Sequence, residues 1–157
     1  MEFTEIPFNL AGSVYRSAMP YGEFDPRGEV FQAYLDHAVS SVVVLVQDEN
    51  IVEESGRDLL QWYAQKGWRV LHLPIRDYGT PDLVELKEVV DEILRRATSG
   101  ENVAIHCLKG VGRTGMVLAC MAKRVFNLQG VQAIEWVRDY VPGAVETAAQ
   151  RAVVENY

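Results

Sequence analysis

Cysteine is scarce in this sequence, and long apolar stretches are absent. The 157 residues include only two cysteines, Cys107 and Cys120, so a disulfide framework is not expected and each thiol needs its own explanation. No apolar run approaches the roughly 20 residues that a membrane-spanning helix needs. The start, MEFTEIPF, also lacks the basic and apolar segments of a secretory signal. These absences predict a cytoplasmic protein without a membrane partner.

Positive charge is also in short supply. Fifteen Lys and Arg residues stand against 22 Asp and Glu residues, which gives a net charge of -7. A chain with this balance has no general attraction for nucleic acid or anionic lipid, so we expect no nucleic-acid partner. Any anion that this protein binds must be held by local geometry.

The chain also lacks internal repeats, low-complexity tracts and any linker rich in Pro, Gly or Ser that would divide it. Its apolar fraction of 48% is enough for a sizeable core. We therefore expect residues 1–157 to form one domain, and we expect that domain to be a monomer.

Three short apolar runs rich in β-branched residues predict strands that are buried on both faces at the centre of a sheet. They are residues 42–46, 70–75 and 103–106. Two stretches with helical spacing of apolar residues join these runs, and the first of them is ended by Gly67. They are residues 53–66 and 81–98. This alternation predicts an α/β layer structure with parallel central strands.

The rest of the chain predicts a sheet edge and further helices. Residues 8–20 contain two short extended pieces around Gly12 and Ser13, which indicates a hairpin at the edge of the sheet. Helical periodicity marks residues 30–38, 114–126, 131–141 and 146–154. The expected fold is α/β, with a central, mainly parallel sheet of about four or five strands and helices on both faces.

The segment HCLKGVGRTG, residues 106–115, directly follows the third predicted strand and opens a helix. The start of a helix carries unpaired backbone N–H groups and a partial positive charge, which together form an anion site. Gly110 and Gly112 let the loop wrap closely around an anion, and Arg113 adds a planar fork that grips two phosphate oxygens. The predicted phosphate-binding residues are Leu108, Lys109, Gly110, Val111, Gly112 and Arg113.

Cys107 lies at the entrance of this loop, where the positive field favours a thiolate, the form that attacks phosphorus. Thr114 is expected to donate its hydroxyl to the sulfur, and His106 to hydrogen-bond loop carbonyls and not to transfer protons. Singly, these residues also fit structural roles, such as a buried thiol, turn glycines and a surface charge. As a group they rarely arise for packing alone. Lys109 either raises the local positive charge or is merely solvated, and the segment lacks the Gly-Lys-Ser/Thr of a nucleotide-binding loop.

Breaking a phosphate ester also needs a proton for the leaving oxygen. Asp77, in the segment LPIRDYGTPD, follows the second predicted strand, and parallel neighbouring strands end at one edge of the sheet. We therefore expect Asp77 beside the loop, on a segment that Gly79 allows to move. Asp77 also fits a turn or a helix N-cap, although Asp82 fills the N-cap role better. Three acidic residues after the first predicted strand either compete for the acid role, contact a substrate or form a solvated loop. They are Asp48, Glu49 and Glu53.

The motif HCLKGVGRTG resembles the signature of the cysteine-dependent protein tyrosine phosphatases, in which five residues separate His-Cys from Arg and then Thr or Ser. Its Arg-Thr-Gly ending resembles the dual-specificity branch of that superfamily. LPIRDYGTP is similar to the general-acid loop of the family, and VRDYVPGAVETAAQ is similar to a late segment of small prokaryotic and archaeal phosphatases. The likeness covers the chain from about Val42 to its end.

By this resemblance Cys107 is the nucleophile that forms a phosphocysteine intermediate, Arg113 the phosphate clamp and Asp77 the general acid. Gln150 either places the hydrolytic water or is an ordinary helix-surface residue. The resemblance implies phosphorylated proteins or peptides as substrates, phosphotyrosine first and phosphoserine or phosphothreonine next, and it implies neither metal nor other cofactor. Small phosphorylated molecules such as inositol phosphates, and a non-catalytic phospho-ligand binding module, are the alternatives. Cys120 is either a resolving thiol or a core residue.

Overall fold

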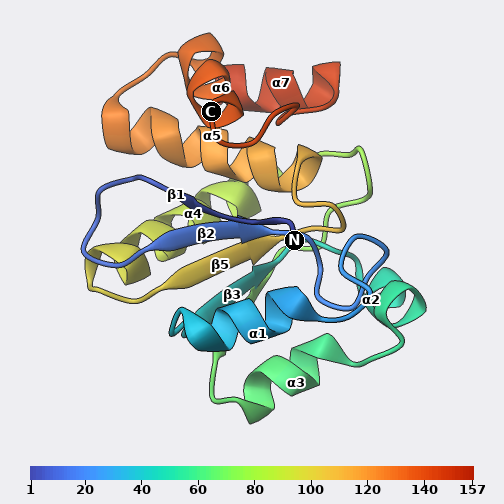
Figure 1. The fold of residues 1–157 in the computed structure, drawn as a ribbon. Helices are drawn as coiled ribbons and strands as arrows, with labels where there is room; N and C mark the ends of the chain where they lie inside the picture. The colour runs from blue at the N-terminus through green and yellow to red at the C-terminus, as the bar shows by residue number, and fades with distance from the viewer.

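The structure, a computed structural model, describes residues 1–157 and builds them around one five-stranded sheet (Figure 1). The strands are β1 (Phe3–Ile6), β2 (Val14–Ser17), β3 (Ser41–Val44), β4 (Arg69–His72) and β5 (Val103–His106). They lie in the order β1-β2-β5-β3-β4, and all neighbours are parallel except the antiparallel pair β1 and β2. The predicted mainly parallel α/β sheet is confirmed.

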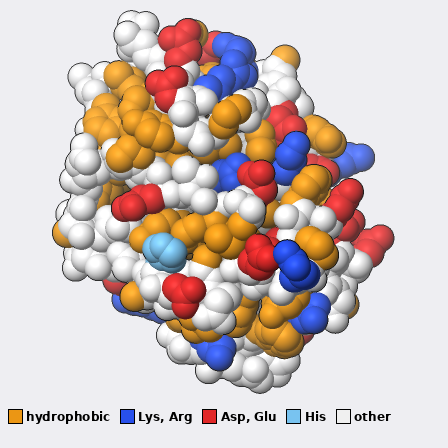
Figure 2. All heavy atoms as spheres, in the orientation of Figure 1, with side chains coloured by type: hydrophobic (Ala, Val, Ile, Leu, Met, Phe, Trp, Pro, Cys, Tyr) orange, Lys and Arg blue, Asp and Glu red, His pale blue; other side chains and the backbone are white.

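Helices cover both faces of this sheet. Three helices lie on one side of the sheet, and four lie on the opposite side (Figure 1). The first group is α1 (Glu29–Asp36), α2 (Asp48–Ser55) and α3 (Leu59–Gln65). The second group is α4 (Leu83–Thr98), α5 (Gly112–Phe126), α6 (Gly130–Arg138) and α7 (Ala148–Asn156). The surface seen in Figure 2 carries acidic and basic side chains close together, without an extended basic patch.

Two strand predictions need correction. The prediction that all three apolar runs lie at the centre of the sheet is wrong for β4, which forms an edge, pairs only with β3 and has no fully buried residue. The strand also ends at His72, two residues before Pro74, which has no N–H to donate to a ladder. At the other edge the hairpin exists, but its first strand, β1, precedes the predicted residues 8–20.

The predicted helix at residues 53–66 is in fact two helices. Gly56 adopts a left-handed conformation, with φ of 68°, and ends α2. Asp58 then accepts a hydrogen bond from the Gln61 backbone N–H at 3.2 Å and starts α3. Gly67, also left-handed, follows the end of α3 as predicted. The break lets α2 and α3 take different directions where the sequence showed one continuous helical pattern.

A buried His-Tyr pair lies where β5 ends. His106 and Tyr63 of α3 are both fully buried, and the Tyr63 hydroxyl lies 2.9 Å from Nε2 of His106. Nδ1 of His106 lies 3.0 Å from the Cys107 carbonyl oxygen. Because a carbonyl only accepts, Nδ1 carries the proton and Tyr63 donates to Nε2. Burial lowers the pKa of His106 to about 4, so the imidazole is neutral near pH 7. His106 thus bonds a loop carbonyl, as predicted.

The His106 pKa makes stability depend on pH. The unfolded chain protonates His106 as the pH falls below 6.5, whereas the folded chain does so only near pH 4, so the free energy of unfolding decreases across this window. The decrease due to His106 should be about 3 kcal/mol. We expect urea unfolding between pH 7 and 4 to show this extra loss in the wild type and not in His106→Asn. Equal pH dependence in the two proteins would contradict the assignment.

Candidate active site

The candidate site lies at the carboxyl edge of the parallel strands, where β5 leads into the phosphate loop, residues 107–113, and α5 begins. Gly110 has φ of 85°, and a Cβ atom there would lie only 2.3 Å from the Ser17 carbonyl oxygen. Glycine is therefore required at this position. The Met19 N–H donates to the Leu108 carbonyl oxygen at 3.0 Å. The end of β2 and the residues that follow it therefore pack against the loop and hydrogen-bond to it.

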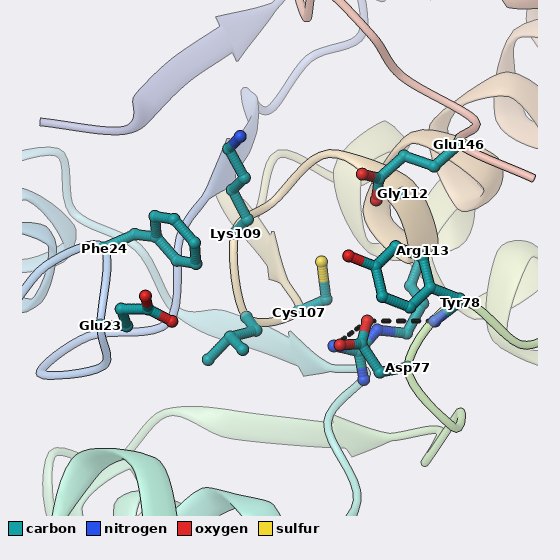
Figure 3. A pocket seen from close by; sticks show the side chains of 10 residues that line it. Glu23, Phe24, Asp77, Tyr78, Cys107, Lys109, Gly112, Arg113 and Glu146 are labelled. Atoms are coloured by element: carbon teal, nitrogen blue, oxygen red, sulfur yellow. Dashed lines mark hydrogen bonds and ion pairs between the residues drawn. The ribbon is translucent and has the colours of Figure 1, made fainter.

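The Cys107 sulfur faces a small pocket at the centre of this loop (Figure 3). Its side chain is buried, with the residue 3% exposed, and the Gly110 N–H donates to Sγ at 3.2 Å. A donor in this place complements a negatively charged sulfur. The loop therefore presents the sulfur of Cys107 where an anion would bind against the start of α5.

Arg113, the second residue of α5, pairs with Asp77 and lines the same cavity as Cys107. Its guanidinium is buried, and Nη1 donates to the Ile75 carbonyl oxygen at 2.9 Å. Nη2 lies 3.2 Å from Oδ1 of Asp77, whose side chain is 57% exposed. Asp77 therefore emerges beside the phosphate loop, as predicted, although the strand before it, β4, is not the direct neighbour of β5 that we expected, because β3 lies between them. Cys107, Arg113 and Asp77 all line one cavity of about 160 Å³.

Four separate segments line this cavity (Figure 3). The lining residues are Glu23, Phe24, Asp77, Tyr78, Cys107, Leu108, Lys109, Gly112, Arg113 and Glu146. Glu23, Phe24 and Glu146 were missed from the sequence, because they come from loops without a motif and reach the site only through the fold. Tyr78 lies in the predicted acid segment, but no role in the site was predicted for it from the sequence. Nζ of Lys109 lies 5.6 Å from the centre of the Phe24 ring, which places this charge at the rim.

Three residues predicted for the phosphate loop and the start of α5 differ in the structure. The Thr114 hydroxyl is fully buried and has no hydrogen-bond partner, so the predicted bond from Thr114 to the Cys107 sulfur is absent. The sulfur instead receives the Gly110 N–H. Val111, which is 7% exposed and belongs to the apolar core, does not line the cavity, and neither does Gly110. Leu108, Lys109 and Gly112 do line it.

Gln150 lies beside the site but outside the cavity lining. Its side chain is fully buried, which excludes an ordinary helix-surface position. Its Oε1 accepts from the Glu146 backbone N–H at 2.9 Å, and its Nε2 donates to the Gly79 carbonyl oxygen at 3.3 Å. Gln150 therefore connects the start of α7 with the segment that carries Asp77.

The other candidate acids lie away from this cavity. Asp48, Glu49 and Glu53 do not line it, and Asp48 lies 3.3 Å from Nδ1 of His72. Cys120 is fully buried in α5, and burial raises the pKa of its thiol to about 12. Such a thiol stays protonated, which supports the core position over a resolving one.

No cluster of three or more His, Cys, Asp or Glu side chains in the structure has the arrangement of a metal site. No helix combines the length and apolar character that crossing a membrane requires.

A family model described as "polymorphic toxin system, DSP-PTPase phosphatase" matches residues 18–125. Among curated proteins, an uncharacterized protein of Methanocaldococcus jannaschii is 42% identical over 89 residues, covering 55% of this chain and 58% of the relative. Human cyclin-dependent kinase inhibitor 3 is 35% identical over 95 residues, covering 59% of this chain and 45% of the relative. The chain spans about half the length of these curated relatives.

Solved structures match over nearly the whole chain. The active form of Tk-PTP is 32% identical, with a TM-score of 0.79, and the match covers 98% of this chain and 95% of that chain. Kinase associated phosphatase with its catalytic-site cysteine replaced by serine has a TM-score of 0.88 at 22% identity, covering 99% of this chain and 93% of that chain, and so shows the fold alone. The phosphate loop, its position after β5 and these matches agree, and the chain belongs to the DSP-PTPase phosphatase family.

Proposed function

We propose that this protein is a metal-independent phosphatase that hydrolyses phosphate monoesters, with phosphotyrosine in proteins or peptides as its substrate. One observation carries the proposal. The sulfur of Cys107, the guanidinium of Arg113 and the carboxylate of Asp77 surround a single cavity at the start of α5. These are a nucleophile, an anion clamp and an acid, the three groups that a two-step displacement at phosphorus needs.

In the first step the Cys107 thiolate attacks phosphorus and forms a sulfur–phosphorus bond. The bond from phosphorus to the leaving oxygen breaks, and Asp77 gives that oxygen its proton. In the second step water attacks phosphorus, the Asp77 carboxylate takes a proton from the water, and Cys107 leaves as a thiolate. Loop N–H groups and Arg113 stabilise the charge on the equatorial oxygens in both steps.

The ion pair between Arg113 and Asp77 fits this sequence of events. In the free protein one nitrogen of Arg113 lies 3.2 Å from Asp77, while another is held by the Ile75 carbonyl oxygen. A phosphate dianion that binds Arg113 competes with the carboxylate for the guanidinium. Substrate binding thus releases Asp77 for proton transfer.

The rim of the cavity supports phosphotyrosine over more highly charged substrates. Figure 3 shows Phe24 and Tyr78 on opposite sides of Cys107, and both aromatic residues are exposed, at 38% and 62%. Rings so placed can contact the phenyl ring of a phosphotyrosine. Glu23 and Glu146 add negative charge to the rim, which repels a molecule that carries several phosphates.

A phosphatase of small phosphorylated molecules is the second candidate, and Lys109 at the rim favours it. The released phosphate from a phosphotyrosine peptide, a phosphoserine peptide and a set of inositol phosphates separates the two candidates. We expect the phosphotyrosine peptide to give the highest kcat/KM, by at least about tenfold, because Glu23 and Glu146 at the rim repel each additional phosphate of an inositol phosphate. Preference for an inositol phosphate would reverse the choice.

Turnover without metal tests the proposed chemistry. In EDTA, the reduced wild type should hydrolyse para-nitrophenyl phosphate and a phosphotyrosine peptide. Cys107→Ser should abolish turnover, and Asp77→Asn should lower kcat on the peptide by about 100-fold or more, because its phenol leaves poorly without a proton. A wild type that retains the peptide but releases no phosphate would be a binding module instead.

Arg113→Lys tests the clamp. Lysine keeps the charge but loses the planar fork, so kcat/KM should fall by about 100-fold, or roughly 3 kcal/mol of transition-state stabilisation. Arg113 also donates to the Ile75 carbonyl oxygen, so thermal unfolding of the variant is measured alongside. Arg95→Lys, an exposed change on α4, serves as the matched control. Wild-type kcat/KM in Arg113→Lys would exclude bidentate binding.

A further inference from the structure

We propose that Gln150 is a positioning residue, which holds the segment that carries Asp77 in place through the carbonyl group of Gly79. This inference rests on the proposed function and differs from the role in water placement that the family resemblance implies. It depends on the buried position of Gln150 and on the two backbone groups that its side chain connects.

The direction of the Gln150 amide is settled by its partners. The Glu146 backbone N–H, 2.9 Å from Oε1, can only donate, so the oxygen of Gln150 must face it. The amide nitrogen then faces the Gly79 carbonyl oxygen, which can only accept, at 3.3 Å. Both ends of the side chain are therefore used by backbone groups, and the side chain lies outside the cavity lining.

The acid segment, residues 76–79, forms a tight turn that needs outside support. The Gly79 N–H donates to the Arg76 carbonyl oxygen at 2.7 Å, and a Cβ atom at Gly79 would lie 2.8 Å from that oxygen. Tyr78 has φ of 60°, a left-handed conformation that disfavours a side chain. A turn with this strain and an exposed tip keeps one conformation only when surrounding groups hold it.

Few contacts from the rest of the protein reach this turn. Arg113 pairs with Asp77. The Thr147 hydroxyl, at the N-cap of α7, donates to the Tyr78 carbonyl oxygen at 3.5 Å, and Gln150 of α7 donates to the Gly79 carbonyl oxygen. A bound phosphate competes for Arg113. The α7 contacts, of which the Gln150 bond is the shorter, then hold the turn while Asp77 transfers its proton.

The segment that precedes α7 is a firm anchor for this contact. Arg138 donates to the carbonyl oxygens of Ala144 and Val145, at 2.8 and 3.0 Å. Gly115 of α5 packs so closely that a Cβ atom there would lie 2.7 Å from the Cβ of Ala144. Gln150 therefore ties the acid turn to a part of the chain that packs directly on the helix carrying Arg113.

The proposal predicts a defect that depends on the leaving group. Proton transfer from Asp77 raises the rate of ester cleavage when the leaving phenol needs a proton. It has little effect on that rate when a strongly acidic phenol leaves as its anion. We therefore measure kcat/KM for aryl phosphates from 2,4-dinitrophenyl to phenyl phosphate, in the wild type, Gln150→Met and Asp77→Asn. The ratio of phenyl to dinitrophenyl kcat/KM should fall at least about tenfold in Gln150→Met, toward the ratio in Asp77→Asn.

This ratio does not depend on the fraction of folded enzyme, so a loss of stability in Gln150→Met does not imitate the effect. Gln150→Glu keeps the acceptor for the Glu146 N–H and replaces the donor to Gly79 with a carboxylate oxygen. This variant should lower the ratio as well, and it replaces Gln150→Met in the test if Gln150→Met does not fold. Gln65→Met, an exposed change at the end of α3, should leave the ratio at the wild-type value.

A wild-type ratio in the Gln150 variants would overturn the proposal. The pre-steady-state kinetics would then show whether Gln150 has another role. The kcat/KM value covers only the steps up to formation of the phosphoenzyme, so an unchanged kcat/KM together with a burst of phenol release would report slow attack by water. That result would assign Gln150 to water placement. A wild type that releases no phenol from any ester would instead refute the proposed function itself.

Discussion

The start of α5 directs backbone N–H groups and the positive end of a helix dipole at the loop that follows β5, and the remaining parts of the site are arranged around this charge. The close approach of Gly110 to the end of β2 fixes the loop from one side. His106 also holds the loop, because its Nδ1 donates to the Cys107 carbonyl oxygen while the Tyr63 hydroxyl donates to its Nε2. An acidic protein can therefore hold a phosphate, because attraction comes from local geometry and not from net charge.

The same loop determines where Asp77, the proposed acid, must lie. Arg113 belongs to α5, but its guanidinium reaches across to the end of the β4 segment, where it bonds the Ile75 carbonyl oxygen and pairs with Asp77. Asp77 itself lies on a strained turn, and its exposed side chain has few neighbours. Gln150 and Thr147 supply the missing support from α7, more than 60 residues further along the chain. Asp77 and Arg113, the proposed acid and clamp, thus belong to one connected arrangement.

Much of this site could be predicted because its residues are close in sequence or fixed by topology. The phosphate loop is one local motif, and Asp77 follows β4, a parallel strand of the same sheet that only β3 separates from β5. Residues such as Phe24 and Glu146 come from loops whose approach depends on the whole fold. The missing bond from Thr114 to sulfur depends on side-chain direction, which spacing does not determine. Gly56 broke a helix where apolar periodicity continued, because its backbone conformation outweighed the pattern.

The central claim is that Cys107 carries the phosphoryl group between two steps. Asp77→Asn supplied with 2,4-dinitrophenyl phosphate isolates this species, since the phenol leaves without a proton but water lacks its base. The account predicts that acid-quenched, digested protein contains one phosphoryl group, detected by mass spectrometry on the peptide that includes Cys107. Release of phenol with no phosphorylated peptide, or with the phosphoryl group on another residue, would contradict it.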